Sequence, residues 1–174
     1  MTTPADAVVL IGPMGAGKTS IGRKVARSLG RPFYDSDIAV VREHGAIADI
    51  FARGGEESFR AYERAAVVEG LRRGGIVSLG GGAVLDARTR ADLAHHRVVL
   101  LTVDPRTVAG RIRDTTRPLL SGGDDAVERW KALYEARRGI YEELADLRVD
   151  TSSGPIGGIV ERVTAWVRAG EEDA

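Results

Sequence analysis

The chain has 174 residues, 43% of them hydrophobic, which predicts one domain over residues 1–174 around a single core. Its 25 basic residues balance 25 acidic ones, so no overall field favours nucleic acid or an anionic membrane as a partner. The absence of cysteine excludes disulfides and thiolate metal sites. The absence of asparagine excludes the base-reading motif of guanine-nucleotide switches and the catalytic-loop asparagine of protein kinases.

The start of the chain and its apolar runs suggest a location in the cell. Residues 1–7 lack the basic and apolar regions of a signal peptide, and the longest apolar runs have the length of strands. We therefore expect a cytoplasmic protein.

The first expected strand, residues 7–11, leads into a glycine-rich loop. Residues 12–19 match the phosphate-binding pattern G-x-x-x-x-G-K-[ST] in full. Glycines let loop amides approach phosphate oxygens, and the helix expected over residues 17–29 would point its positive end at the anion. The expected nucleotide-binding residues here are Gly12, Met14, Gly15, Ala16, Gly17, Lys18, Thr19 and Ser20. The motif predicts that the chain binds a nucleoside triphosphate.

Two loop residues have distinct predicted roles. Lys18 would reach the β- and γ-phosphates, and Thr19 would offer its hydroxyl to Mg²⁺. The alternative is a glycine-rich turn with a chance lysine, which the order of strand, loop and helix makes much less favourable.

The second expected strand, residues 32–36, ends at a pair of aspartates. If Asp35 and Asp37 alternate along a strand, both carboxylates face one side, and the carboxyl ends of parallel strands line the ligand crevice. One could hold hydrated Mg²⁺ and the other could accept a proton. The alternative is a polar turn with Asp37 as a helix cap, but the neighbouring phosphate loop favours the first interpretation.

A helical insertion is expected over residues 38–73, interrupted near Gly45 and at Gly54–Gly55. It is too long for a simple crossover and could form a substrate-binding subregion. Within it, Glu63 follows Arg60 at a helical spacing that would let Glu63 orient the guanidinium. Taken alone, this pair is more typical of an exposed salt bridge.

The third expected strand, residues 76–79, precedes three consecutive glycines. Gly80, Gly81 and Gly82 would let a small substrate lie directly against backbone amides. A flexible turn is the alternative.

The remaining elements complete an alternation of strands and helices. Strands are expected at residues 98–103 and 147–150, and residues 114–125 have the charges and turn formers of a mobile lid. The alternation predicts a parallel sheet with helices on both faces.

Together, these motifs resemble those of the shikimate kinases, small P-loop enzymes with a nucleoside-monophosphate-kinase-like fold. The resemblance covers nearly the whole chain, with five motifs in the family's order. They are residues 12–19, residues 35–37, residues 47–51 with 55–60, residues 80–82, and residues 117–120. The resemblance implies an α/β three-layer sandwich with a five-stranded parallel sheet, the substrate-binding insertion and the lid.

The same resemblance implies transfer of the γ-phosphoryl group of ATP to the 3-hydroxyl of shikimate, a step toward chorismate and the aromatic amino acids. By similarity, Asp37 is expected to act as a base or to orient the acceptor hydroxyl. Asp35 is expected to contact Mg²⁺ mainly through water, beside Thr19. Lys18 and Arg117 are expected to neutralise charge on the transferring phosphoryl group.

Shikimate itself is expected to be held by several motifs, again by similarity. Arg60 and Arg137 would grip its carboxylate as bidentate donors. The ring would lie on Gly80, Gly81 and Gly82, between the apolar walls Phe51 and Phe59. Near adenine, the resemblance places Arg113, with Arg111 as the alternative. The active unit is expected to be a monomer.

Two other functions remain open. A related P-loop kinase could act on gluconate, aminoshikimate or a nucleotide, but a non-carboxylate acceptor would leave Arg60 and Arg137 without a joint role. A nucleotide-binding regulator without phosphotransfer would be free to lose Asp37, yet the chain retains it together with Lys18 and Arg117. The expected function is therefore a shikimate kinase that uses ATP and Mg²⁺.

Overall fold

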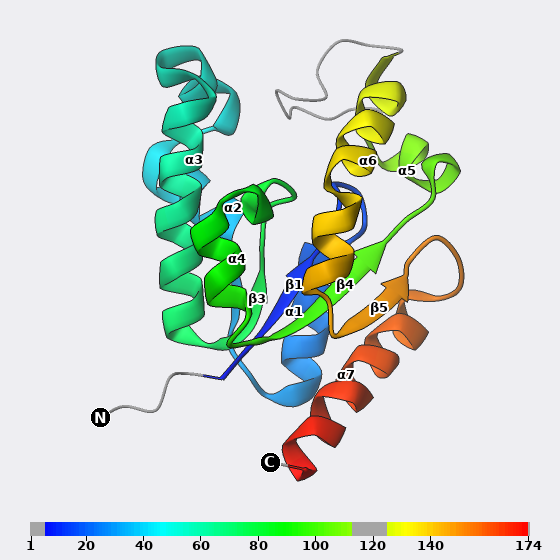
Figure 1. The fold of residues 1–174 in the computed structure, drawn as a ribbon. Helices are drawn as coiled ribbons and strands as arrows, with labels where there is room; N and C mark the ends of the chain where they lie inside the picture. The colour runs from blue at the N-terminus through cyan, green and yellow to red at the C-terminus, as the bar shows by residue number, and fades with distance from the viewer. Residues whose placement is uncertain (1–5, 113–124, 174) are drawn as a thin grey trace.

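The computed structural model describes residues 6–112 and 125–173, in which five parallel strands form one sheet with helices on both faces (Figure 1). The strands are β1 (Ala7–Ile11), β2 (Phe33–Asp35), β3 (Gly75–Ser78), β4 (Arg97–Thr102) and β5 (Leu147–Asp150). Their order across the sheet is β2-β3-β1-β4-β5, and all neighbouring pairs are parallel. The predicted parallel α/β architecture is confirmed.

The helices alternate with these strands along the chain. They are α1 (Lys18–Leu29), α2 (Ser36–His44), α3 (Ile47–Arg73), α4 (Ala87–Leu93), α5 (Pro105–Ile112), α6 (Ala126–Leu144) and α7 (Ile156–Glu172), with a 3₁₀ turn η1 at Ala83–Leu85. In Figure 1, α3 and α4 lie on one side of the sheet, and α1 and α7 lie on the other.

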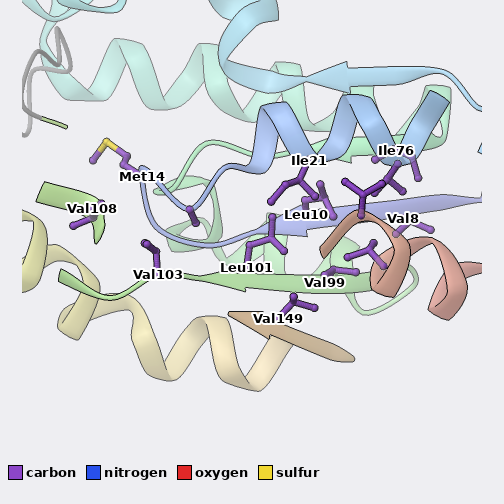
Figure 2. Packing of buried hydrophobic residues seen from close by; sticks show 14 of the residues in the cluster. Val8, Leu10, Met14, Ile21, Ile76, Val99, Leu101, Val103, Val108 and Val149 are labelled. Carbon is purple, nitrogen blue, oxygen red and sulfur yellow. The ribbon is translucent and has the colours of Figure 1, made fainter. Parts of the chain in front are cut away.

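Two hydrophobic clusters cover the two faces of the sheet, because successive strand residues point to opposite faces. Val8 and Leu10 of β1 pack in one cluster, and Val9 packs in the other. Figure 2 shows the first cluster, with Leu10, Ile21 and other apolar side chains gathered between the sheet and α1. Burial on both faces explains why residues 7–11 are apolar throughout.

The junction of β2 and α2 differs from the prediction. β2 ends at Asp35, and α2 begins at Ser36, because the Asp35 side chain accepts a hydrogen bond from the Ile38 amide at 3.0 Å and caps the helix. Asp37 therefore lies in the first turn of a helix, so the expectation that the two aspartates alternate along one strand is wrong. The alternative was wrong as well, since the cap is Asp35 rather than Asp37.

The other boundaries lie close to those expected. β1 and β5 begin and end at the predicted residues, while β3 and β4 each start one residue earlier. The predicted insertion forms α2 and α3, and Gly45 ends α2 with a φ of 88°. Gly55 interrupts α3 with a φ of 71°, a left-handed conformation that favours glycine. Both predicted interruptions are confirmed.

The predicted lid lies outside the described residues, except for Asp125. Arg113 and Arg117 also lie outside them, so their predicted roles stay predictions. Within the described ranges, no helix is long and apolar enough to cross a membrane.

Candidate active site

Two adjoining pockets lie where β1, β2 and β3 end. The first, here called the loop pocket, is lined by Gly15, Gly17, Lys18, Thr19, Ser20, Asp35, Asp37, Ser78 and Leu79. The second, here called the arginine pocket, is lined by Met14, Asp37, Ile47, Phe51, Phe59, Arg60, Glu63, Gly81, Gly82 and Arg137. Asp37 lines both pockets, so it stands at the place where their contents would meet.

The glycine-rich loop between β1 and α1 wraps the loop pocket. Gly12 has a φ of 141°, and a Cβ atom there would overlap the carbonyl oxygen of Leu101. Gly15 and Gly17 also have positive φ, at 81° and 89°. Only glycine allows this path without strain, which is why the motif needs glycines at these positions.

Lys18 is the first residue of α1 and lies almost fully buried in the loop pocket, with 8% of its surface exposed. Its ammonium group donates hydrogen bonds to the carbonyl oxygens of Gly12 at 2.8 Å and of Pro13 at 3.0 Å. The loop therefore curls around the Lys18 side chain and holds a positive charge inside the pocket. A buried cation at a helix N-terminus favours a highly charged anion as its ligand.

Thr19 and Asp35 form a hydroxyl–carboxylate pair at the edge of the loop pocket. The Thr19 hydroxyl donates to Asp35 Oδ2 at 2.6 Å. Among the described residues, no group of three or more histidine, cysteine, aspartate or glutamate side chains could hold a metal. Mg²⁺ commonly takes only one or two protein ligands when phosphate oxygens and water complete its shell. The pair therefore fits a Mg²⁺ ion that binds together with a nucleotide.

The arginine pocket brings together side chains from distant parts of the chain. Arg60 comes from α3 and Arg137 from α6, and both line this pocket. Phe51 and Phe59 form part of its wall, with ring centroids 5.3 Å apart. The mixture of apolar walls and convergent cations suits a small anionic molecule.

The three glycines after β3 lie beside Asp37 and the arginine pocket. A Cβ atom on Gly80 would lie 2.5 Å from Asp37 Oδ1, so glycine is needed for this close approach. The Gly80 amide donates to the Ser36 hydroxyl at 3.0 Å, and the Tyr141 hydroxyl donates to the Gly81 carbonyl oxygen at 2.5 Å. Residues 80–82 are buried and hydrogen-bonded on both sides, and Gly81 and Gly82 form a turn.

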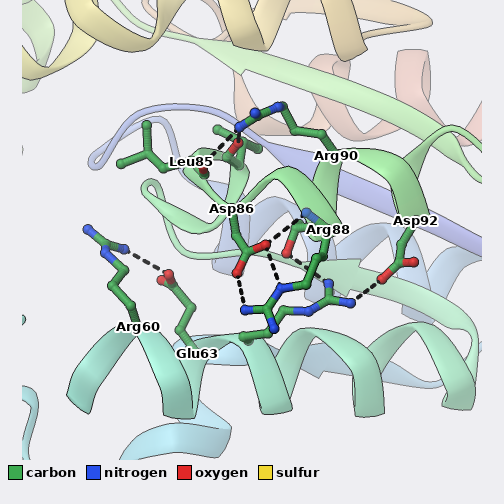
Figure 3. Close-up of polar contacts among 10 residues, drawn as sticks. Arg60, Glu63, Leu85, Asp86, Arg88, Arg90 and Asp92 are labelled. Atoms are coloured by element: carbon green, nitrogen blue, oxygen red, sulfur yellow. Dashed lines mark hydrogen bonds and ion pairs between the residues drawn. The ribbon is translucent and has the colours of Figure 1, made fainter. Parts of the chain in front are cut away.

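Arg60 and Glu63 form the ion pair that their spacing predicts, and Figure 3 shows them extending from the same helix. Arg60 Nη1 donates to Glu63 Oε1 at 2.7 Å, and Glu56 lies 3.2 Å from Arg60 Nη2. Glu63 has only 4% of its surface exposed, so the alternative of an ordinary exposed salt bridge is wrong. The pair orients the Arg60 guanidinium inside the pocket.

Burial raises the pKa of the Glu63 carboxyl to about 7. The ion pair with Arg60 opposes this shift, and the negative charge of Asp37 adds to it. Loss of hydration outweighs the neighbouring arginine, because the carboxylate has almost no contact with water. Glu63 is therefore partly protonated near neutral pH.

We expect stability to fall with rising pH because of Glu63. Its pKa is raised from 4.5 to about 7 on folding, so its contribution is complete below 4.5 and is lost as the pH rises through 7. Urea unfolding should give a free energy of unfolding that is about 1 to 3 kcal/mol lower at about pH 8 than at about pH 5. Glu63→Gln should abolish this difference.

A matched control for this prediction is Glu69→Gln on the same helix. Glu69 is half-exposed, and hydrogen bonds from Arg72 and Arg73 lower the pKa of its carboxyl to about 2. Glu69 is almost fully ionised in the folded state and mostly ionised in the unfolded state from about pH 5 upward, so the control should keep nearly all of the pH dependence of the wild type. If Glu63→Gln kept the pH dependence of the wild type, the pH dependence of stability would not come from Glu63.

Some site residues were not predicted from the sequence. Met14 was assigned to the nucleotide, yet it lines the arginine pocket, as does Ile47, which opens the motif at residues 47–51 but was given no site role. Ile47 lies one turn before Phe51 on α3, a helical spacing that could have indicated a shared face. Arg111, the alternative residue for adenine, donates to the carbonyl oxygens of Gly15 at 2.6 Å and of Thr151 at 3.1 Å.

Comparison with known proteins gives consistent results. Residues 14–168 match the sequence model of the family described as "Shikimate kinase". A shikimate kinase from Thermobifida fusca is 51% identical over 147 residues, which cover 83% of this chain and 84% of the relative.

Comparison with solved structures agrees with the sequence comparisons. A shikimate kinase from Acinetobacter baumannii, solved in complex with shikimate, superposes with a TM-score of 0.88 at 33% identity, covering 95% of this chain and 94% of the other. A gluconokinase from Sinorhizobium meliloti has a TM-score of 0.62 at 21% identity, covering 98% of this chain and 95% of the other. The gluconokinase therefore shares the fold, whereas the shikimate kinases are similar in sequence as well.

Proposed function

This chain belongs to the shikimate kinase family and is an ATP-dependent phosphotransferase, and from this premise we propose how its two pockets divide the reaction. The loop pocket takes the phosphates of ATP, and the arginine pocket takes shikimate. The observation that carries this assignment is the position of Asp37, which lines both pockets. The γ-phosphate and the acceptor hydroxyl would meet beside its carboxylate.

The arginine pocket suits the carboxylate of shikimate. Arg60 and Arg137 supply planar guanidinium groups that can each form two parallel hydrogen bonds to a carboxylate. Phe51 and Phe59 provide apolar surface for the ring, which would lie against the glycines 80–82. An acceptor without a carboxylate, such as a neutral sugar, would offer no negative charge to Arg137 or to the donors of Arg60 that Glu56 and Glu63 leave available.

Asp37 is positioned to act on the acceptor hydroxyl. Its carboxylate would accept the hydroxyl proton or orient the oxygen for attack on the γ-phosphorus. Lys18, buried in the loop pocket, would balance charge on the transferring phosphoryl group. Arg117 is proposed to assist it and Arg113 to lie near adenine, although both lie outside the described residues.

Thr19 and Asp35 would hold the magnesium ion that accompanies ATP. The Thr19 hydroxyl would coordinate the ion directly, and Asp35, which already accepts the hydrogen bond from that hydroxyl, would bind one of its waters. Bound Mg²⁺ would neutralise charge on the β- and γ-phosphates. Omitting the metal should therefore stop turnover.

We also propose that the active unit is a single cytoplasmic domain that works as a monomer. The two pockets adjoin within one domain, and α2 and α3 would form the acceptor-binding insertion of that domain. Size-exclusion chromatography with light scattering would test the monomer, because an active dimer that dissociates into inactive chains would contradict it.

Truncating either pocket arginine should weaken shikimate binding without harming ATP binding. A charge-assisted hydrogen bond lost from a largely buried site costs about 1.5 to 3 kcal/mol, or roughly ten- to a hundredfold in affinity. Calorimetry on Arg60→Lys, Arg137→Lys and Arg137→Ala should show this loss. Lysine should rescue binding poorly, because a point charge cannot reproduce the two-pronged geometry.

Two controls separate recognition from folding. The carboxamide analogue of shikimate should lose little affinity in these variants, since it offers no negative charge to the arginines. Arg64→Lys, on α3 beside Glu63, should bind shikimate normally, because Arg64 instead donates to Thr89 and Asp92. Equal losses for shikimate and the carboxamide would mean that Arg60 and Arg137 are structural.

A further inference from the structure

Three side chains from outside the glycine-rich loop donate hydrogen bonds to its backbone. Three consecutive loop carbonyls each accept a hydrogen bond from a different part of the chain. The bonds are Trp130 Nε1 to Met14 O (2.7 Å), Arg111 Nη1 to Gly15 O (2.6 Å) and Thr151 Oγ1 to Ala16 O (2.8 Å). The donors come from α6, α5 and the residue after β5.

Each of these bonds also sets the direction of an amide. A carbonyl and the next residue's N–H belong to one planar trans peptide unit and point in opposite directions. The bond to Met14 O therefore directs the Gly15 amide, and the bond to Ala16 O directs the Gly17 amide. Both glycines line the loop pocket. The middle unit closes the loop on itself, because the Ala16 amide donates to Pro13 O at 3.3 Å.

Trp130 has a fixed orientation. Only 1% of its surface is exposed, and its ring stacks on Tyr134 with centroids 5.4 Å apart. An indole N–H can only donate, so a buried indole needs an acceptor at this place. The Met14 carbonyl is that acceptor, and the packing of α6 thus determines where the peptide between Met14 and Gly15 lies.

Thr151, the residue after β5, makes the equivalent contact. Its hydroxyl lies 2.8 Å from Ala16 O and 3.0 Å from Thr102 O, but it has a single proton to donate. The Thr102 carbonyl already accepts the Thr151 amide at 2.8 Å. The shorter distance favours the Ala16 carbonyl as acceptor of the hydroxyl proton, and Thr151 is buried, with 4% of its surface exposed.

We propose that Trp130 and Thr151 are positioning residues that aim the Gly15 and Gly17 amides into the loop pocket before the nucleotide binds. Gly15 and Gly17 have positive φ, and glycine has more backbone freedom than any other residue. A loop without these hydrogen bonds would therefore lose more conformational entropy on ordering around phosphate than the loop seen here. Donors that are already oriented bind an anion without that cost. The inference rests on the proposed assignment of the loop pocket to the phosphates.

The test removes each donor: Thr151→Val keeps the shape of the side chain, and Trp130→Phe keeps one aromatic ring in its place. Trp130→Phe and Thr151→Val should each weaken binding of inorganic tripolyphosphate and of MgADP about five- to tenfold in calorimetry, the effect of one lost neutral hydrogen bond. Thr151→Ser, which keeps the hydroxyl, should restore binding. Shikimate affinity measured without nucleotide should change less than twofold in Thr151→Val, since Ala16 and Gly17 do not line the arginine pocket.

The chain offers a matched control for each substitution. Trp166, the other tryptophan, lies on α7 against Arg97, and Thr164 is a buried threonine on the same helix. Trp166→Phe and Thr164→Val make the same chemical changes away from the loop, so they should bind tripolyphosphate like the wild type. Losses in these controls equal to those in the test variants would show a general effect on stability and overturn the proposal.

Lys18→Ala distinguishes failure of this inference from failure of the pocket assignment. If Lys18→Ala loses tripolyphosphate binding but Trp130→Phe and Thr151→Val keep it, the positioning role is wrong and the assignment stands. If Lys18→Ala also keeps it, the assignment itself is wrong, and the proposal falls with it. Thr151→Val decides the outcome by itself if Trp130→Phe does not fold.

Discussion

Replacing Lys18 by alanine is expected to abolish detectable transfer of phosphate from ATP to shikimate. The substitution removes a cation that lies buried in the loop pocket, where it would stabilise charge on the transferring group. Loss of such a group costs on the order of a thousandfold in kcat or more. A coupled assay of ADP release with saturating shikimate and Mg²⁺ measures the effect.

The control for this prediction is Lys24→Ala. Lys24 lies on the same helix, α1, but is exposed to solvent and does not line the loop pocket, so this variant should retain full activity. Because Lys18 also bonds the loop carbonyls of Gly12 and Pro13, shikimate binding to Lys18→Ala should be measured as a check on folding. Activity like that of the wild type in Lys18→Ala would refute the assignment of the loop.

Replacing Asp37 by asparagine should lower kcat about a hundredfold or more while changing ATP affinity little. Asparagine keeps the size of the side chain but removes its charge and its ability to accept a proton. Asp37 lies in the first turn of α2 and lines both pockets, so the loss should appear in the chemical step. Steady-state kinetics with each substrate varied in turn separates kcat from KM.

A second acidic residue provides the control. Asp49 occupies the first turn of α3, as Asp37 does in α2, but it is exposed and lines neither pocket. Asp49→Asn should therefore have normal kinetics. If kcat is preserved in Asp37→Asn and only the KM for shikimate rises, Asp37 positions the acceptor and does not take part in proton transfer.

The parts of the fold that the sequence predicts well depend on local pattern. The run at residues 7–11 is apolar at every position because β1 is buried on both faces, and its boundaries are those predicted. Gly45 and Gly55 interrupt the helices because their backbone φ angles are positive. The match of residues 12–19 to a phosphate-binding pattern likewise needs only short-range spacing.

The end of β2 shows where local reasoning fails. An extended run and a capped helix compete for the same few residues, and the hydrogen bond from the Ile38 amide to Asp35 decides in favour of the helix. Alternation along a strand therefore predicted the wrong geometry for Asp37. The residue nevertheless lies at the junction of the pockets, because the first turn of α2 projects from the same edge of the sheet.

The sequence by itself determined the order of strands and helices, the phosphate-binding loop and, through resemblance, the family and the residues expected to act. Only the tertiary structure decided which side chains share a pocket and how deeply each is buried. Glu63 follows Arg60 by three residues in any helix, but its raised pKa requires the loss of water that packing imposes. Trp130 and Thr151 carry no local signal of their contacts with the loop, because hydrogen bonds between distant segments depend on where the sheet and α6 place them.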